Sequence, residues 1–410
     1  ISNIRSIALA HSEELGQEAV SETGFGKMPD KKKKIELAAL KTPGIEDLNP
    51  RTWTGDYGLS LQEPAPYGVI LSITPSTNPP STVINNSISM IAGGNSVIFQ
   101  PHPGANRVSL KTVQLIQKAL VSVGAPADVV QCVKNPTIES ANELMRHNGI
   151  DLVVVTGGAG VVNAALNCGK KAICAGPGNP PVIVDETADI TKAAKDIVSG
   201  ASFDNGILCT AEKETFVVDS VADELIQKMK SFGAFYLSPN DAERITKMVI
   251  AEDEKGSGER HPIVNKEYIG KNASVIAEKA GIKVDDDVQL LFFEAQWDNP
   301  LVMAEQLMPV MPVVRVPNVD EAMRLAIIVE HKFKHSFIMH SKNVERLSKM
   351  AQMCDATIFV KNGPSYSGLG YNGEGYTTLT IAGTTGDGLT SAKTFTRPRR
   401  CVLIDYFRIV

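Results

Sequence analysis

Three short segments of the chain contain residues whose types and spacing could support chemistry. The first is the turn at residues 203–210, where Cys209 stands among polar residues and a glycine. A thiol in such a turn is easier to ionise than one buried in an apolar element. The alternative, a buried and inert thiol, is our interpretation of the other five cysteines: Cys132, Cys168, Cys174, Cys354 and Cys401.

The second and third segments connect a strand pattern to a helix pattern. Residues 73–80 read Ile-Thr-Pro-Ser-Thr-Asn-Pro-Pro, which suits either a ligand-binding loop or a turn whose Ser and Thr cap a helix. Residues 155–160 read Val-Thr-Gly-Gly-Ala-Gly, and glycines there would let the backbone approach a phosphate at a helix N-terminus. Asn163 replaces the last glycine of the dinucleotide fingerprint, so this spacing alone is a weak signal.

These loops belong to a regular alternation of apolar strand patterns and helical patterns. The predicted strands are 68–73, 96–99, 128–133, 151–155 and 171–174, and the predicted helices are 82–92, 106–123, 138–147 and 161–167. Continuously apolar strands separated by helices predict a parallel sheet with both faces covered. Such a sheet holds its ligands at the carboxyl ends of its strands.

A second alternation begins after a glycine- and proline-rich segment at residues 175–181, which we take as the domain boundary. It has a predicted strand at 181–184, a helix at 187–200 and a strand at 214–218. Four further segments receive separate predictions. They are a helix over 1–24, a solvated helix face for Lys31–Lys34, an exposed loop at 251–260, and a strand at 401–404 that pairs outside the main sheets.

The composition excludes several classes of protein. A net charge of -5 gives no basic excess for nucleic acid, and no apolar run reaches the length of about 20 residues that a membrane span needs. The six cysteines form no C-x-x-C pair, which favours reduced thiols over a disulfide framework or a metal site. We therefore expect an intracellular enzyme with no nucleic-acid or membrane partner and no metal.

In this order, the motifs resemble the aldehyde dehydrogenase superfamily, and within it the CoA-acylating propionaldehyde and acetaldehyde dehydrogenases of bacterial microcompartments. The resemblance covers essentially the whole chain and rests on residues 74–79, 99–103, 156–160, 174–181, 202–209, 361–366 and 394–402. It implies an α/β fold with two doubly wound parallel-sheet domains. The expected domains are a Rossmann-type cofactor domain at 1–178, a catalytic domain at 179–388 and an oligomerisation strand at 389–410.

The resemblance also implies roles for single residues. Cys209 matches the nucleophile, and Asn78 matches the side chain that forms the oxyanion hole with the Cys209 backbone N–H. Glu305 matches the acid that holds the nicotinamide ribose, although Leu307 stands where the family has an aromatic residue. The other expected cofactor contacts are Thr74, Pro75 and Ser76, the turn Thr156, Gly157 and Gly158 beneath the phosphates, and Gln100 and His102 near the adenosine.

One departure from the hydrolytic relatives concerns water. Those relatives have a glutamate that activates water on the thioester, at a place that falls on Ala175 here, and no carboxylate occurs anywhere in residues 170–184. An acyl-enzyme without that base waits for a better nucleophile, such as the thiol of CoA. The alternatives are a hydrolytic NAD(P)-dependent enzyme that releases a carboxylic acid and a catalytically idle scaffold that binds nucleotide.

The expected cofactors and partners follow from the resemblance. They are NAD⁺, CoA as co-substrate, a short aldehyde, and further copies of the chain in a dimer or a dimer of dimers. We expect the enzyme in the bacterial cytoplasm, inside a microcompartment, with shell proteins contacted through a segment that precedes Ile1. What activates Cys209 stays open, because no histidine adjoins it, and His335 and His340 read more readily as structural.

Overall fold

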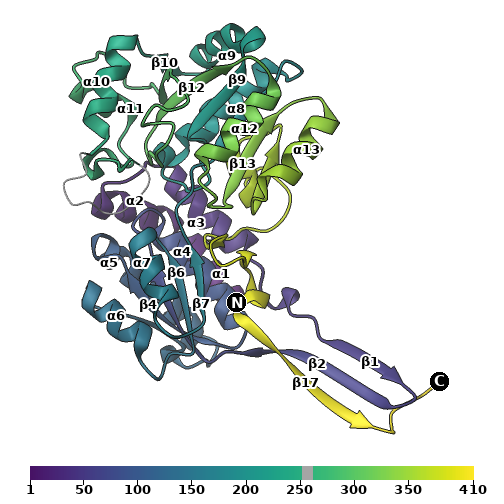
Figure 1. Ribbon diagram of the computed structural model, residues 1–410. Helices are drawn as coiled ribbons and strands as arrows, with labels where there is room; N and C mark the ends of the chain where they lie inside the picture. Colours follow the sequence, from purple (N-terminus) through teal and green to yellow (C-terminus); the bar gives the residue numbers. More distant parts are fainter. Residues whose placement is uncertain (252–261) are drawn as a thin grey trace. The chain divides into compact units, whose positions relative to one another are not determined.

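The computed structural model describes residues 1–251 and 262–410 (Figure 1). The chain forms two compact units, and neither is a single continuous segment. Unit 1 comprises residues 1–18, 32–176 and 376–410, and unit 2 comprises residues 19–31 and 177–375. The exposed loop predicted at residues 251–260 lies, apart from Ala251, outside the described residues.

Unit 1 is built around a five-stranded parallel sheet. Its order is β5 (Val130–Cys132), β4 (Ser96–Pro101), β3 (Val69–Thr74), β6 (Leu152–Thr156) and β7 (Ala172–Ala175). The strands are apolar along their length because helices cover both faces. Leu71 and Val153 pack in one cluster with residues of α6 and α7, whereas Ser72 accepts a hydrogen bond from Asn86 of α4.

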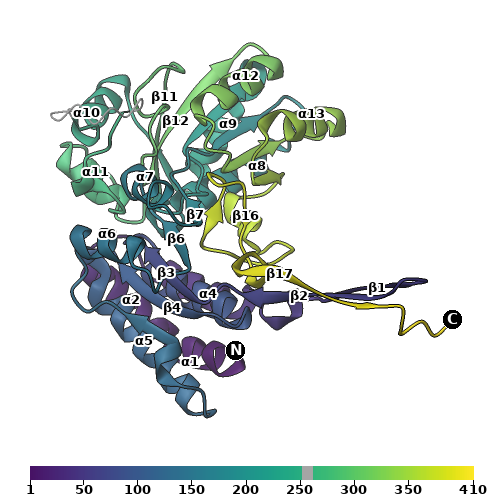
Figure 2. The same cartoon turned by 60° about the horizontal axis from the view of Figure 1, so that its bottom comes forward.

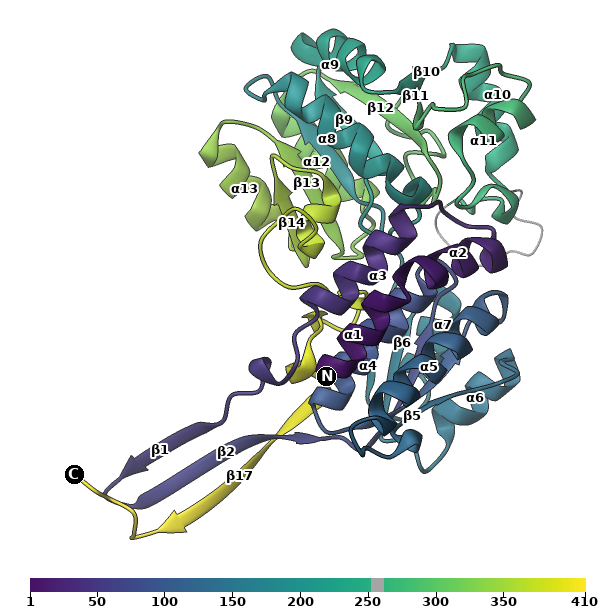
Figure 3. The same cartoon turned by 180° about the vertical axis from the view of Figure 1, so that it is seen from behind.

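The helices of unit 1 confirm the first predicted alternation, with ends that differ by a few residues. They are α4 (Pro79–Ala92), α5 (Asn106–Val121), α6 (Ile138–Arg146) and α7 (Ala159–Leu166). The helix predicted over 1–24 is instead two helices, α1 (Ser2–Ala10) and α2 (Ser12–Thr23). His11 ends the first, and Ser12 followed by Glu13 and Glu14 begins the second, an arrangement that favours a new helix start. Helix α1 lies beside α4 and α5 (Figure 3).

The prediction of a solvated face for Lys31–Lys34 is wrong. These residues lie in α3 (Asp30–Lys41), and the exposed fractions of Lys31 and Lys34 are only 2% and 3%. Their spacing of three places both on one side of the helix, where each finds a buried polar partner. The run of like charges concealed this, because burial of a lysine depends on partners that are distant in sequence.

A three-stranded antiparallel arm belongs to unit 1. It consists of β1 (Arg51–Gly55), β2 (Gly58–Pro66) and β17 (Thr396–Ile404), which run side by side (Figure 2). The predicted strand at 401–404 is confirmed, and it pairs with β2 rather than with a main sheet. The first two strands had not been predicted, because prolines and exposure on both sides remove the alternating pattern that marks a strand. A small pair, β15 (Ile381–Ala382) and β16 (Gly388–Leu389), completes unit 1.

Unit 2 is built around a seven-stranded parallel sheet. Its order is β10 (Ala234–Tyr236), β11 (Leu290–Glu294), β12 (Val310–Val316), β9 (Glu214–Val218), β8 (Pro181–Val184), β13 (Ser336–His340) and β14 (Ile358–Lys361). Its helices are α8 (Ile190–Ser202), α9 (Asp219–Ser231), α10 (Pro239–Val249), α11 (Ala273–Lys279), α12 (Val319–Val329) and α13 (Val344–Cys354). Helices α12 and α13 share a core with β9, β12 and β13, while α10 and α11 pack at the β10–β11 side.

The units differ from the expected domains at two places. Residues 19–31 belong to unit 2, because Lys31 and Asp30 bond to Asp204 there. Residues 376–388 belong to unit 1, where the backbone N–H of Thr377 bonds to Lys41 and Thr380 contacts Thr156. Neither contact could be inferred from sequence proximity. Among the described residues, no helix has the length and apolar character that crossing a bilayer requires.

Candidate active site

The sheet of unit 1 brings the predicted cofactor loops to one edge. The chain runs from β3 through β4 to β5 in one direction, then returns to β6 on the other side of β3. The strand order therefore reverses between β3 and β6, which is where open parallel sheets bind ligands. Thr74 ends β3 at this point and is followed by Pro75 and Ser76. Thr156 likewise ends β6 and is followed by Gly157 and Gly158.

The turn after β6 is open enough to admit a phosphate. Gly158 is the residue that precedes α7, and a Cβ added at Gly158 or Gly160 would meet nothing within 4 Å. At Gly157, by contrast, an added Cβ would lie 2.8 Å from Val161, so the turn must be glycine there to keep its shape. The Thr156 hydroxyl is fixed 2.9 Å from that of Thr380. The residues present therefore fit the diphosphate of a dinucleotide at a helix N-terminus.

Gln100 and His102 lie at the end of β4, next to β3, but their side chains have local structural partners. The Gln100 amide donates to Thr137 O at 3.2 Å and to Ser140 Oγ at 3.0 Å, at the start of α6. His102 is exposed, and its Nδ1 accepts from the Gly104 N–H at 3.0 Å. A contact of either residue with adenosine stays a prediction, and the structure gives both a second reason to be present.

Asn78 is buried at the start of α4, with its carboxamide oriented by a lysine. Lys34 Nζ donates to Asn78 Oδ1, and since an ammonium has no acceptor, the amide oxygen must face it. The Asn78 NH₂ group is thereby turned the other way, where one hydrogen reaches Thr77 Oγ1 at 3.2 Å. The second hydrogen is of the kind that an oxyanion hole requires.

The turn before Cys209 has an unusual backbone. Asp204, Asn205 and Gly206 have φ values of 49°, 57° and 70°, the left-handed region that side chains disfavour. A Cβ at Gly206 would lie 2.9 Å from the carbonyl oxygens of Ala201 and Met308. Three successive residues of this kind persist only where the surrounding structure enforces them.

The enforcing contacts within unit 2 are polar and buried. Lys31 Nζ lies 3.1 Å from Asp204 Oδ2, with exposed side-chain fractions of 2% and 0%. The Asp204 N–H donates to Asp30 at 3.0 Å, and Asp204 Oδ1 accepts from the Lys27 N–H at 2.8 Å. Asn205 donates to the Gly270 carbonyl at 2.9 Å. The sequence showed none of these partners.

Four neighbouring strands of unit 2 place the chemically active groups at their amino ends. Gly178 precedes β8, Cys209 precedes β9, Glu305 precedes β12 and His335 precedes β13, and these strands are adjacent in the order β12-β9-β8-β13. Because the strands are parallel, their amino ends meet at one edge. The candidate nucleophile therefore lies at the edge opposite to the one that the rule for parallel sheets indicates.

Gly178 lies at the centre of this group. Its N–H donates to Glu305 Oε1 at 3.2 Å. A Cβ at Gly178 would stand 2.7 Å from the Cys209 carbonyl and 2.9 Å from the His335 ring. Glycine is therefore required for Cys209, His335 and Glu305 to approach one another. Cys209 itself is half-buried.

Charged residues immediately after Cys209 are buried rather than solvated. Glu212 and Lys213 have exposed fractions of 3% and 1%, and Glu214 of 0%. Burial raises the pKa of Glu212 to about 7, although the Ser365 N–H and hydroxyl donate to its two oxygens. Burial likewise raises the pKa of Glu305 to about 7, against the opposing effects of Lys213 and the Gly178 N–H.

His335, which the sequence favoured as a structural residue, lies in this group. Burial and the charge of Lys213 lower its pKa to about 4, so the imidazole is neutral at physiological pH. Its Nδ1 lies 2.9 Å from Ser336 Oγ, while Nε2 has no hydrogen-bond partner among the described residues. A neutral imidazole nitrogen without a hydrogen-bond partner is able to accept a proton.

The remaining cysteines differ from Cys209 in their surroundings. Burial raises the pKa of Cys132 to about 12 and that of Cys174 to about 11, and it also raises the pKa of Cys354. Ala175, where hydrolytic enzymes would have their glutamate, is a buried residue at the end of β7. Leu307 is half-buried with a φ of 53°, strained for a leucine.

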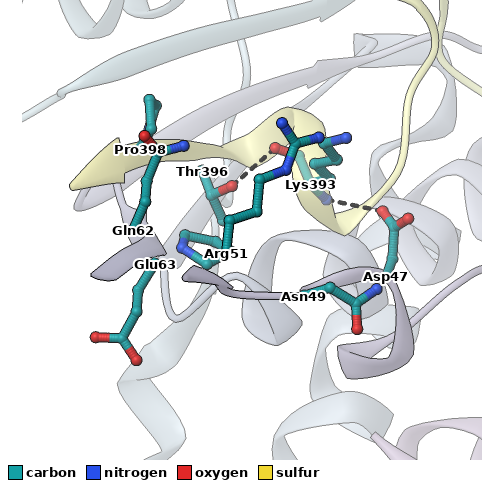
Figure 4. A pocket seen from close by; sticks show the side chains of 9 residues that line it. Asp47, Asn49, Arg51, Gln62, Glu63, Lys393, Thr396 and Pro398 are labelled. Carbon is teal, nitrogen blue, oxygen red and sulfur yellow. Dashed lines mark hydrogen bonds between the residues drawn. The ribbon is translucent and has the colours of Figure 1, made fainter. Parts of the chain in front are cut away.

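A separate hollow of about 490 Å³ lies at the root of the arm of unit 1 (Figure 4). Its polar groups bond to one another and to neighbouring residues. Asp47 accepts from the Lys393 N–H at 3.0 Å, and the Thr396 hydroxyl donates to the Lys393 carbonyl at 2.8 Å. None of the predicted site residues lines this hollow, and its mixed charges suit a contact surface better than a small-molecule site.

Three features together indicate the class of this protein. They are the two parallel-sheet units, the glycine turn where the strand order reverses, and the cysteine on a turn that buried contacts enforce. The model of the aldehyde dehydrogenase family matches residues 3–372. The chain belongs to the aldehyde dehydrogenase family.

Comparison with individual proteins shows which members of this family are similar to the chain over nearly its full length. The chain is 50% identical over 409 residues to the acetylating acetaldehyde dehydrogenase EutE of Salmonella typhimurium, with 99% of this chain and 87% of that protein covered. A propionaldehyde dehydrogenase of the Clostridium phytofermentans fucose utilisation microcompartment has a TM-score of 0.96 at 45% identity, with 100% of this chain and 92% of that chain covered. A Rhodopseudomonas palustris propionaldehyde dehydrogenase was solved with CoA and an acylated cysteine. Its TM-score with this chain is 0.94 at 48% sequence identity, with 98% of this chain and 91% of that chain covered.

Proposed function

We propose that this protein oxidises a short aldehyde to its acyl-CoA, with Cys209 as the nucleophile. The enzyme is an NAD-dependent oxidoreductase of the CoA-acylating aldehyde dehydrogenase class, the class of its relatives over the full chain. The observation that supports the choice of cysteine is the enforced turn, which presents Cys209 beside Gly178, His335 and Glu305.

The chain's own groups suit the first half of the reaction. As thiolate, Cys209 adds to the aldehyde carbon and gives a thiohemiacetal whose oxyanion takes hydrogen bonds from the Cys209 N–H and from the Asn78 amide. Bound NAD⁺ supplies the acceptor for the hydride that the thiohemiacetal carbon loses. We propose that the turn Thr156–Gly158 holds its phosphates and that Glu305 holds its nicotinamide ribose. A thioester on Cys209 is the product of this half-reaction.

The second half transfers the acyl group to the thiol of CoA. Exchange of one thioester for another is nearly isoenergetic, so the step is reversible. His335 is suited to accept the proton of the incoming thiol, because its imidazole is neutral and its Nε2 has no other partner among the described residues. The glutamate that activates water in hydrolytic relatives has no counterpart here, since residue 175 is alanine. The acyl-enzyme is therefore expected to wait for CoA.

We further propose homo-oligomerisation through the arm and a location inside a bacterial microcompartment. The arm exposes several large apolar side chains, among them Val402, Leu403 and Ile404 at 54%, 40% and 57%, and apolar exposure of this extent is typical of protein interfaces. The microcompartment location is supported by the origin of a similar propionaldehyde dehydrogenase. The preferred aldehyde, acetaldehyde or propionaldehyde, would be compared in the same assay.

The test is formation of NADH from propionaldehyde and NAD⁺, with and without CoA. We expect steady turnover only with CoA, and at most one NADH per site without it. Cys209→Ala should be silent in both arms, whereas Cys132→Ala, which removes a second half-buried thiol, should keep the wild-type rate. Steady turnover without CoA would mean that the enzyme hydrolyses its thioester, and an active Cys209→Ala would exclude the assigned nucleophile.

The role proposed for Asn78 has its own test. Loss of one oxyanion-hole donor lowers turnover by about 10²–10³-fold, so Asn78→Ala should keep a small, measurable kcat. Asn85→Ala is the matched control, because Asn85 is equally buried in α4 but bonds to Thr42 and Leu379. The control should lose stability and retain kcat within a few-fold. Equal losses of kcat in both variants would exclude Asn78 as a hydrogen-bond donor to the oxyanion.

A further inference from the structure

Lys213 is a buried cation that the mechanism above leaves without a role. It follows Cys209 by four residues, immediately before β9, and its side chain is 1% exposed. Its Nζ donates to the carbonyl oxygens of Gly206 at 2.7 Å and Leu208 at 3.3 Å. These carbonyls belong to the same turn as Cys209, and Leu208 is its immediate neighbour. The ammonium is therefore anchored beneath the nucleophile's own backbone.

Burial of the Lys213 ammonium costs folding free energy, which suggests that its charge has a role at this position. A buried lysine without a compensating anion is strongly destabilised, and cores usually replace it with an apolar residue. Among the described residues, the hydrogen bonds of Lys213 go to carbonyls and not to carboxylates. Hydrogen bonds alone would also be served by a neutral donor such as glutamine. The charge itself calls for an explanation.

Several titratable groups face Lys213, and burial shifts the pKa of the carboxyl groups and of His335 toward the neutral form. Burial raises the pKa of Glu214 well above its usual value, and it raises those of Glu212 and Glu305 to about 7. His335 is neutral, because its pKa is lowered to about 4 by burial and by Lys213. The thiol of Cys209 is the remaining group.

The electrostatic interaction between Lys213 and Cys209 is seen in its effect on the pKa of Lys213. Burial lowers the pKa of Lys213, and the groups that oppose this are Glu305 first and Cys209 second, ahead of Glu214 and Glu212. An interaction that favours the ammonium when Cys209 is ionised favours the thiolate equally when Lys213 is charged, since the coupling is reciprocal. The effect is strong in a site of low polarity.

We propose that Lys213 is a positioning residue that keeps Cys209 reactive, by placing a buried ammonium beneath the nucleophile turn so that the thiol ionises at physiological pH. The inference rests on the proposed role of Cys209 as nucleophile. It assigns to a lysine the activation that other cysteine enzymes obtain from an adjacent histidine. Ionisation sends the thiol proton to solvent and leaves a thiolate–ammonium pair in place of a thiol and an isolated cation.

The experiment measures the rate at which iodoacetamide alkylates Cys209 as a function of pH, without aldehyde or cofactor. Peptide mass spectrometry separates Cys209 from the exposed Cys401, which serves as an internal reference in each sample. The wild-type midpoint should lie clearly below the ordinary thiol value of about 8.5. In Lys213→Gln, which keeps hydrogen-bond donors but removes the charge, we expect a midpoint higher by about one pH unit or more, and about tenfold slower alkylation near pH 7.

The matched control is Lys31→Gln. Lys31 is the second buried lysine that holds this turn, but it does so through Asp204. Its loss should change the alkylation rate at every pH and leave the midpoint at the wild-type value. An unchanged midpoint in Lys213→Gln would overturn the proposal. An equal shift in both variants would also overturn it, because the shift would then come from a changed conformation of the turn and not from loss of the Lys213 charge.

A folding defect in Lys213→Gln would not leave the proposal untested. The ultraviolet thiolate absorbance of the wild type, with that of Cys209→Ala subtracted, gives the same midpoint without a lysine variant. A value at or above about 8.5 overturns the role of Lys213, and a lower value supports it. Failure of the underlying function looks different, because Cys209→Ala would then retain CoA-dependent turnover whatever the midpoint.

Discussion

Cys209 owes its chemistry to residues that act on it from nearby backbone and from separate strands. Its position could be read from the sequence, since it stands in a polar turn and matches a family motif. Lys213 and His335 could not. The string Ala-Glu-Lys-Glu-Thr reads as a solvated stretch, and only the fold reveals that all three charged residues are buried. Desolvation of charge is a tertiary property that local pattern does not encode.

Glu212 offers a test of this burial through pH. Its carboxyl has a folded-state pKa raised from 4.5 to about 7, so the unfolded chain releases the proton at lower pH than the folded protein. Stability contributed by this group is therefore lost as pH rises from 4.5 to about 7, by about 3 kcal/mol at most. Glu212→Gln, which cannot ionise, should gain in relative unfolding free energy over that range.

The measurement is denaturant unfolding of wild type and Glu212→Gln at several pH values, followed by a signal from unit 2. The variant will start at a disadvantage, because its amide NH₂ cannot accept from both Ser365 donors. The quantity of interest is thus the slope of the difference against pH, not its sign at one pH. A difference that is independent of pH would mean that Glu212 is ionised normally in the folded protein.

At the scale of elements, apolar runs and helical spacing predicted the main sheet and helices of unit 1 and the first three elements of unit 2, which are β8, α8 and β9. The turn at residues 203–206 was recognised as a loop, but its geometry was not, because three left-handed residues require enforcement by distant partners. The antiparallel strands β1 and β2 were missed for a related reason. β1 pairs only with β2, and β2 is stabilised on its other side by β17, more than three hundred residues away.

The buried pair of Lys31 and Asp204 is the strongest enforcement of that turn. Removing one partner of a buried pair leaves an uncompensated charge and costs about 3–5 kcal/mol. Lys31→Met should therefore show a marked loss of unfolding free energy, measured with urea. The double variant Lys31→Met, Asp204→Leu should recover part of it, since no lone charge remains. A double variant that is worse by the sum of both single changes would mean that the pair contributes shape and not charge.

At the scale of the whole molecule, the division into two units was foreseen, and the boundary near residue 176 carried the glycine and proline signal expected of one. The discontinuity of the units was not foreseen. A segment such as residues 19–31 has helical patterns on either side of it, and nothing local marks which unit its contacts join. Contacts between residues far apart in sequence decide such membership.

The arm makes a testable contribution to assembly. Val402 is an apolar residue of β17 with 54% of its surface exposed, in a strand that pairs only on one side with β2 among the described residues. A charge there should disfavour association, so Val402→Asp should elute with a lower mass in size-exclusion chromatography with light scattering. Val123→Asp is the control, because Val123 is similarly exposed at 62% but lies just beyond α5. Equal masses for wild type and Val402→Asp would exclude the arm from the interface.

The interleaving of the two units has a consequence for biosynthesis. A ribosome produces the chain from its first residue, and unit 2 has all of its residues once residue 375 has emerged. Unit 1 lacks β15, β16 and β17 until the last residues are released, although its central sheet is synthesised first. Unit 1, whose central sheet is translated first, is thus completed after unit 2, and in the interval β2 presents an unpaired edge of the kind that recruits other chains. Termination of synthesis between residues 376 and 410 would therefore leave unit 2 complete and unit 1 open.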